Sequence, residues 1–252
     1  MTALALARRP PLRSWARRGE RLLGWGPQGA RPGRGLAAAR LDSEDLLRKL
    51  RDCPSSSAPP NEIVPGLYIS GLLALQNVEL LPKRGVTHVL NAAEPWLHKL
   101  AGLDLASSGF KVQTFGAGDR DSLDAPADLA GRFQTVCSFL AEGRREGAAL
   151  VHCASGVSRS SSLCMAYLML EEAWSLETAL RLVFRARPVV RPGPGSWRQL
   201  RWLEAELADS CGGDLGFRRL RLPDEAAENA AAALVKELDA GLAAPRAPAS
   251  AP

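Results

Sequence analysis

The sequence predicts one α/β domain with a central sheet, and three observations lead to this expectation. Short apolar segments of strand length alternate with longer segments of helical periodicity through the middle of the chain. One such strand, Ala148–Val151, runs directly into a loop of small residues that a helix follows. Three helical segments in succession then complete the domain. Strands that alternate with helices and end in a helical run are typical of a sheet with helices packed on it.

Local signals place the elements of the first half of the chain. Ser43 is a suitable N-cap for a short helix, and the Pro- and Ser-rich stretch Cys53–Pro60 is expected to be a linker. Ile63–Ile69 contains two short strand pieces around a Pro-Gly turn, and Val86–Leu90 is predicted to be a buried strand. Residues 72–82 are expected to form a helix between them.

The second half alternates in the same way before its helical end. Lys111–Phe115 is predicted to be a strand, and an acidic loop separates it from a helix over Pro126–Ala141. After the strand Ala148–Val151, helices are expected near residues 159–171, 175–186 and 196–208. The Ala/Glu-rich segment 223–241 is expected to be an exposed helix without chemistry, followed by a disordered Pro/Ala-rich end.

Length and composition suit one domain with tails. A chain of 252 residues with a hydrophobic fraction of 46% can bury the core of a domain of about 150 residues. We therefore expect a basic, disordered N-terminal arm at 1–57, a compact catalytic domain at 58–210 and an Ala-rich tail at 211–252. No apolar run approaches the roughly 18 residues that a membrane span requires, so no transmembrane segment is expected.

The basic charge of the chain is concentrated in the arm. Residues 1–40 contain nine arginines and a single acid, Glu20, so they carry +8 while the remaining 212 residues sum to −3. No aromatic–basic recognition motif indicates a nucleic-acid partner. Within residues 12–23, arginines and apolar side chains fall on opposite sides of a helix, as in a mitochondrial presequence. A disordered arm is the alternative, and we expect a cytoplasmic or nuclear location, with mitochondria as the alternative.

The segment Leu150–Ser160 carries the clearest chemical signal. It reads Leu-Val-His-Cys-Ala-Ser-Gly-Val-Ser-Arg-Ser and joins the end of a strand to the start of a helix. Successive backbone N–H groups at a helix N-terminus form a concavity that binds tetrahedral oxyanions, and a glycine allows the required curl. An arginine at the helix start adds a bidentate fork for two phosphate oxygens. The expected phosphate-binding residues are Ala154, Ser155, Gly156, Val157, Ser158 and Arg159.

Cys153 is the candidate nucleophile of this loop. The chain has five cysteines without a CxxC pair or Cys/His ligand spacing, which argues against a disulfide framework and against a zinc site. A helix N-terminus and a nearby cation favour the thiolate form of a cysteine, which can attack a bound phosphorus. Ser160 can donate a hydrogen bond to the sulfur, and His152 is expected to orient the loop. The alternative is a buried structural cysteine at the end of a strand.

A thiolate mechanism also requires an acid to protonate the leaving oxygen and a base to activate water. The candidates lie in the acidic loop that follows the strand Lys111–Phe115. Asp119 is closest to the end of the strand and is the first choice, with Asp121 second and Asp124 third. Each of them can also be a solvated loop residue, and Asp124 can be the N-cap of the next helix.

On these residues, the segment 61–208 resembles the small, atypical dual-specificity protein phosphatases. The matching pieces include Val64–Ile69, Val86–Asn91 and the signature Val151–Ser160. The resemblance implies a mostly parallel sheet of about five strands flanked by helices, with a phosphate-binding loop between a strand and a helix. It also implies hydrolysis of protein phosphotyrosine and phosphoserine or phosphothreonine through phosphocysteine at Cys153, with Asp119 as acid and base. No metal and no cofactor are expected, because Arg159 and the loop amides provide charge stabilisation.

One departure from the family pattern concerns the pocket. The family has an asparagine that buttresses the phosphate loop, whereas this chain reads Pro192-Gly-Pro-Gly-Ser-Trp197. Its loss predicts a slower reaction or a looser substrate fit, and Trp197 is expected at the usual aromatic position. The alternative function is therefore a weakly active or inactive phosphoprotein-binding scaffold. His88 is expected on a buried strand and His98 in a loop, and both are expected to be structural.

Overall fold

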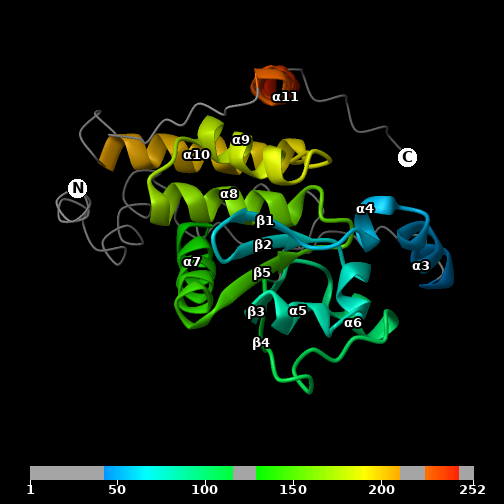
Figure 1. The fold of residues 1–252 in the computed structure, drawn as a ribbon. Helices are drawn as coiled ribbons and strands as arrows, with labels where there is room; N and C mark the ends of the chain where they lie inside the picture. The colour runs from blue at the N-terminus through cyan, green and yellow to red at the C-terminus, as the bar shows by residue number, and fades with distance from the viewer. Residues whose placement is uncertain (1–42, 116–128, 211–224, 244–252) are drawn as a thin grey trace, which may run out of the picture.

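The computed structural model describes residues 43–115, 129–210 and 225–243 (Figure 1). The arginine-rich segment 12–23 lies outside the described residues, so the expected location stays a prediction. The candidate acids Asp119, Asp121 and Asp124 also lie outside them. None of the helices in the described ranges combines the length and apolar character needed to cross a membrane.

A five-stranded sheet forms the centre of the domain, with strand order β1-β2-β5-β3-β4. The strands are β1 (Asn61–Val64), β2 (Leu67–Ser70), β3 (Val86–Asn91), β4 (Lys111–Thr114) and β5 (Ala148–His152). Only the β1–β2 pair is antiparallel; the other three pairs are parallel. Every residue of the central strand β5 is buried, as is typical of a parallel strand covered on both faces. The predicted α/β class with a mostly parallel sheet is confirmed.

Helices cover both faces of this sheet. Figure 1 shows α8 (Arg159–Glu172), α9 (Leu176–Ala186) and α10 (Pro194–Ser210) stacked on one side, and α5 (Leu80–Lys83) and α6 (Pro95–Leu100) on the other. The first face carries Leu67, Leu90 and Val151 into the larger core, and the second carries Val89 and Leu150 into a smaller one. The helices are α3 (Ser43–Arg51), α4 (Pro54–Ser57), the 3₁₀ turn η1 (Leu73–Gln76), α5 (Leu80–Lys83), α6 (Pro95–Leu100), α7 (Leu129–Glu146), α8 (Arg159–Glu172), α9 (Leu176–Ala186), α10 (Pro194–Ser210) and α11 (Glu225–Ala243).

The single helix expected over residues 72–82 is wrong. The chain forms the 3₁₀ turn η1 and the short helix α5 instead, and Asn77 between them leaves the helical region at φ −91° and ψ 65°. Pro82 explains the break, because proline in a helix interior removes a hydrogen bond and clashes with the carbonyl four residues earlier.

Two further elements differ from the sequence prediction. The expected linker contains α4, whose Ser56 is fully buried. A proline at the start of a short helix suits this position, because its missing N–H would have no intrahelical partner. The segment after β3 forms α6, which places His98 on a helix and not in the expected loop.

The C-terminal helix α11 packs on the domain, although an exposed helix was expected. It lies against the outer side of α9 and α10 in Figure 1, with Ala231 fully buried and Leu234 only 7% exposed. Val235 and Leu238 also pack against the larger core. These four positions follow the spacing i, i+3, i+4, i+7, which is the pattern of one buried helix face. The Ala/Glu-rich composition of the segment made this apolar stripe difficult to recognise in the sequence.

Polar contacts fix α11 as well. Asp239 accepts a hydrogen bond at 2.8 Å from Nε1 of the buried Trp197 and one at 3.0 Å from Nε of Arg201. Glu237 pairs with Arg191 and Glu228 with Arg181. The domain boundaries at 57/58 and 210/211 stay predictions, but packing contacts cross both.

A charge placed on the buried face of α11 tests this packing. We expect Ala231→Glu to lower the free energy of unfolding by about 2 kcal/mol or more, because it buries an unpaired carboxylate. Ala233→Glu is the matched control, since Ala233 is exposed on the same helix; it should change the stability by less than about 0.5 kcal/mol. Urea unfolding of the full chain, followed by circular dichroism, measures both. Equal stability of the two variants would contradict the docking of α11.

Candidate active site

The loop between β5 and α8 brings Cys153 to the carboxyl edge of the sheet. Cys153 directly follows β5, and α8 begins six residues later at Arg159. The Cys153 side chain is buried, and its Sγ accepts a hydrogen bond from the backbone N–H of Gly156 at 3.2 Å. Ser160 Oγ lies 3.2 Å from the same sulfur, within reach to donate its proton to a thiolate. The sulfur therefore faces two groups that stabilise negative charge.

The carbonyl oxygens of residues 154–157 point away from this sulfur. Each accepts a hydrogen bond from a donor that lies outside the loop. The oxygen of Ala154 accepts from Ser56 Oγ and from the N–H of Leu72, each at 3.0 Å. The oxygen of Val157 accepts from the N–H of Arg191 at 2.9 Å.

Arg187 holds the two middle carbonyls. Its Nε donates to the oxygen of Gly156 at 2.8 Å, and its Nη2 donates to the oxygen of Ser155 at 3.2 Å. Nη1 donates to Oδ1 of Asn61 at 2.8 Å, and Nη2 also contacts the oxygen of Ser55. The side chain is only 2% exposed. One buried guanidinium thus fastens the loop to β1 and to the segment that contains α4.

These bonds determine where the amide groups point. A trans peptide places its C=O and its N–H on opposite sides. Outward carbonyls of Ala154, Ser155, Gly156 and Val157 therefore turn the N–H groups of the four following residues inward. The hydrogen bond from the Gly156 N–H to Cys153 Sγ is a direct instance. The N–H groups of the first turn of α8 lack intrahelical partners and add to the same positive concavity.

Gly156 is required by space and by conformation. Its φ is 71°, in the left-handed region that favours glycine. A Cβ at this position would lie 2.6 Å from the backbone carbon and oxygen of Ser70 and 2.7 Å from Nη2 of Arg187. The predicted role of Gly156 in curling the loop agrees with this geometry.

Arg159 stands at the start of α8 with its side chain largely shielded from solvent. Its guanidinium Nη1 lies 4.0 Å from Oε1 of Glu94, the residue that precedes α6. The structure thus brings Cys153, Gly156, Arg159 and Ser160 to one loop and helix start. The candidate acid Asp119 cannot be placed beside them, since it lies outside the described residues.

A pair of histidines lies beneath the loop. Nε2 of the buried His152 is 2.9 Å from Nε2 of His98, and its Nδ1 is 3.4 Å from the carbonyl oxygen of Cys153. Burial lowers the pKa of His152 to about 3, and the nearby His98 and Arg159 act in the same direction. An imidazole with that pKa is uncharged at neutral pH, which favours an orienting role over proton transfer.

A backbone contact links the loop to Gly193, in the segment where the resemblance led us to expect an asparagine. The N–H of Gly193 donates to Ser158 Oγ at 2.9 Å, and this joins the segment before α10 to the loop. Trp197 is fully buried in the larger core, with its indole N–H on Asp239. The expected effect of this substitution on the rate stays a prediction.

Comparison with known proteins identifies the family. The profile described as "Dual specificity phosphatase, catalytic domain" matches residues 67–206, more than half of the chain. The chain belongs to this family. It is 37% identical over 170 residues to dual specificity protein phosphatase 26 of Rattus norvegicus, an alignment that covers 66% of this chain and 77% of the relative. The matched residues contain the whole of the Cys153 loop.

Two other matches define the extent of the similarity. MAP kinase phosphatase with leucine-rich repeats protein 3 of Dictyostelium discoideum is 36% identical over 152 residues, which is 59% of this chain but 16% of that protein. The crystal structure of human DUSP28 is 30% identical, covers 60% of this chain and 95% of that chain, and gives a TM-score of 0.50. The similarity thus covers the catalytic domain of the dual specificity phosphatases.

The residues that hold the loop from outside were not predicted from the sequence. Arg187, Ser56 and Asn61 come from segments far from Cys153 in the sequence, and Ser56 fell in the expected linker. The only indication in the sequence was that Arg187 directly follows a predicted helix and precedes Pro188. This dipeptide does not show that the side chain of Arg187 is buried against the loop.

Replacement of Arg187 by lysine tests its positioning role in this phosphatase. Lysine keeps the charge but lacks the fork that holds two carbonyls. We expect kcat/KM on an aryl phosphate to fall by about tenfold or more. Such a fall corresponds to a loss of about 1.4 kcal/mol of transition-state stabilisation. Inhibition by inorganic phosphate should weaken in parallel. Arg185→Lys is the control, because Arg185 is exposed in the last turn of α9, two residues before Arg187; an Arg187→Lys enzyme as active as this control would refute the role.

Proposed function

We propose that this chain hydrolyses phosphotyrosine and phosphoserine or phosphothreonine in proteins, with Cys153 as nucleophile. The observation that carries the proposal is the orientation of the loop, whose amides turn inward around a buried sulfur that already accepts a hydrogen bond. The names of the relatives support phosphorylated proteins as substrates. Nucleic-acid binding is no part of the proposal.

In the first step, the phosphate group binds to the inward amides and to the guanidinium of Arg159. The thiolate of Cys153 attacks phosphorus in line with the bond to the leaving oxygen. A P–S bond forms, the P–O bond breaks, and the leaving oxygen takes a proton from the aspartate, for which Asp119 is the first choice. The amides and Arg159 stabilise the charge on the equatorial oxygens.

In the second step, water attacks the phosphocysteine while the same aspartate removes a proton from it. The P–S bond breaks, inorganic phosphate forms, and the sulfur leaves as a thiolate. Ser160 Oγ, 3.2 Å from the sulfur, can donate a hydrogen bond to this leaving group. The cycle ends with the thiolate and the protonated acid restored.

The scaffold alternative is not favoured. The matching profile is that of a catalytic domain, and the relatives are named as phosphatases. The contact between Gly193 and Ser158 also gives the loop a support where the family asparagine is missing.

Replacement of the nucleophile tests the proposal directly. Cys153→Ser should lower the hydrolysis of para-nitrophenyl phosphate by at least about a thousandfold, because a hydroxyl at this position is a poor nucleophile. Cys137→Ala is the matched control: Cys137 is equally buried, and burial raises the pKa of its thiol well above the usual value. This control should retain turnover. Comparable activity of Cys153→Ser and the unaltered enzyme would refute Cys153 as nucleophile.

The three candidate acids can be separated by leaving-group dependence. Asp119→Ala should lower kcat by about a hundredfold on phenyl phosphate, a poor leaving group, and less on para-nitrophenyl phosphate. Asp121→Ala and Asp124→Ala are the controls in the same loop and should change kcat by less than about threefold on both substrates if Asp119 alone supplies the proton. Full kcat of Asp119→Ala on phenyl phosphate would assign the acid elsewhere.

A further inference from the structure

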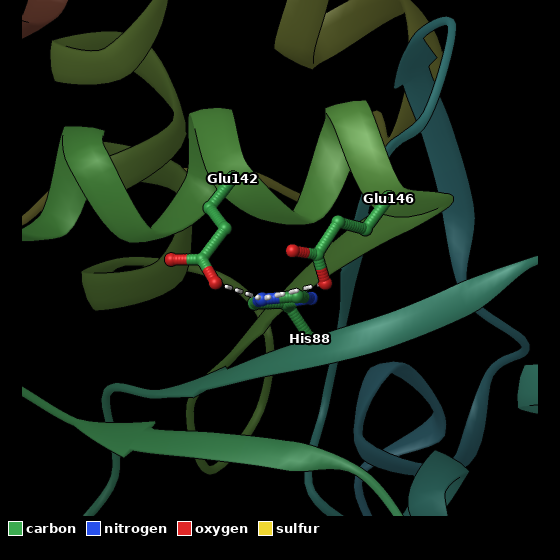
Figure 2. A group of neighbouring side chains, drawn as sticks. All are labelled: His88, Glu142 and Glu146. Atoms are coloured by element: carbon green, nitrogen blue, oxygen red, sulfur yellow. Dashed lines mark ion pairs between the residues drawn. The ribbon is translucent and has the colours of Figure 1, made fainter.

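A second cluster of ionisable side chains lies between β3 and α7, away from the Cys153 loop. His88 on β3 faces Glu142 and Glu146 on α7, as Figure 2 shows. His88 Nε2 is 3.6 Å from Oε1 of Glu142 and 4.0 Å from Oε2 of Glu146. Lys111 on β4 lies beside both carboxylates, with Nζ at 2.8 Å and 2.9 Å from the same two oxygens.

The ring of His88 is held so that Nε2 faces the two carboxylates. The Thr87 hydroxyl donates to the carbonyl oxygen of Ala148 at 3.4 Å, and its oxygen lies 2.8 Å from His88 Nδ1. When Nδ1 carries the hydrogen and donates it to the Thr87 oxygen, the lone pair of Nε2 is free to bind a cation. His88 is fully buried, and none of the described residues gives Nε2 a hydrogen bond.

The two glutamates are placed where a cation is favoured. They lie four residues apart on one face of α7, a spacing at which like charges repel. Glu146 is the last residue of that helix, where the helix dipole favours positive charge. Lys111 is the cation that the structure places there, with its Nζ within hydrogen-bond distance of both carboxylates.

Gly143 allows this close approach of α7 to β3. A Cβ at residue 143 would lie 2.7 Å from Cβ and 2.9 Å from Cγ of His88. A solvent-open hollow of about 420 Å³ has Glu142, Phe139 and Gln113 among its lining residues. An ion can therefore approach Glu142 from solvent, and both carboxylates are partly exposed.

We propose that His88 Nε2, Glu142 Oε1 and Glu146 Oε2 form a Zn²⁺ site, with Lys111 as the cation that competes for it. Zinc bonds of about 2.0–2.2 Å at tetrahedral angles put ligand atoms about 3.3–3.6 Å apart. The nitrogen–oxygen distances of 3.6 Å and 4.0 Å need only a small contraction to reach this range. One imidazole and two carboxylates leave a fourth position for water, and the Thr87 contact to Nδ1 is the outer-shell support typical of a ligating histidine.

The site would join α7 to the centre of the sheet. His88 is on β3, which pairs with β5, and α7 ends two residues before β5 begins. A bound ion would replace the flexible Lys111 ammonium, whose side chain is 55% exposed, by bonds that include the buried imidazole. Zn²⁺ is therefore expected to stabilise the fold without taking part in the reaction at Cys153.

The experiment measures Zn²⁺ binding and thermal unfolding in the full chain with Cys153→Ser, so that the reactive thiol adds no ligand. Zn²⁺ should bind and raise Tm, and Co²⁺ should give the visible absorption of a tetrahedral site. Glu142→Gln with Glu146→Gln should weaken Zn²⁺ binding by more than about 100-fold and abolish the Co²⁺ band. Both glutamates are partly exposed, so this variant should fold.

Replacement of the competing lysine separates a metal site from an ion-pair network. Lys111→Met should tighten Zn²⁺ binding by about tenfold, since it removes a cation within hydrogen-bond distance of both ligand oxygens. Lys83→Met is the control at an exposed lysine elsewhere and should leave binding unchanged. Zn²⁺ binding that is equal in the double glutamine variant, or that Lys111→Met fails to strengthen, would overturn the site.

Discussion

The four carbonyl groups of Ala154–Val157 point outward, and the loop amides that would meet a phosphate depend on this orientation. A buried, charged side chain, Arg187, holds the two middle ones, while Ser56 and the N–H of Arg191 hold the outer two. Because each peptide is planar, loss of an outer donor would free the peptide to turn and remove an N–H from the concavity. The binding surface is thus fixed from its far side.

The same arrangement concentrates positive charge around Cys153. Burial lowers the pKa of Arg187 and the nearby Cys153 acts in the opposite direction, but an arginine keeps its charge in a protein. The inward amides, the start of α8 and the guanidinium of Arg159 add to this field. His152 contributes no charge at neutral pH, because burial lowers its pKa to about 3. The chemistry therefore rests on fixed dipoles and two arginines.

Features that depend on neighbouring residues could be predicted from the sequence. The strand, loop and helix around Cys153 form one continuous segment, so their order could be predicted. Gly156 indicated that the loop backbone curls tightly. Arg187 and Ser56 could not be assigned a role, since they lie 31 and 98 residues from their loop partners. The packing of α11 was missed because Ala231 is small and weakly apolar, although its spacing with Leu234 indicated a buried face.

Cys153 is proposed to take the phosphoryl group within the concavity that the inward amides of its loop form. Rapid mixing of the enzyme with an aryl phosphate, acid quenching and mass spectrometry of the proteolytic peptides measure this directly. We expect a phosphoryl adduct on the sulfur of Cys153 that forms and decays at the rate of turnover. Turnover without an adduct on this residue, or with the adduct on another side chain, would contradict it.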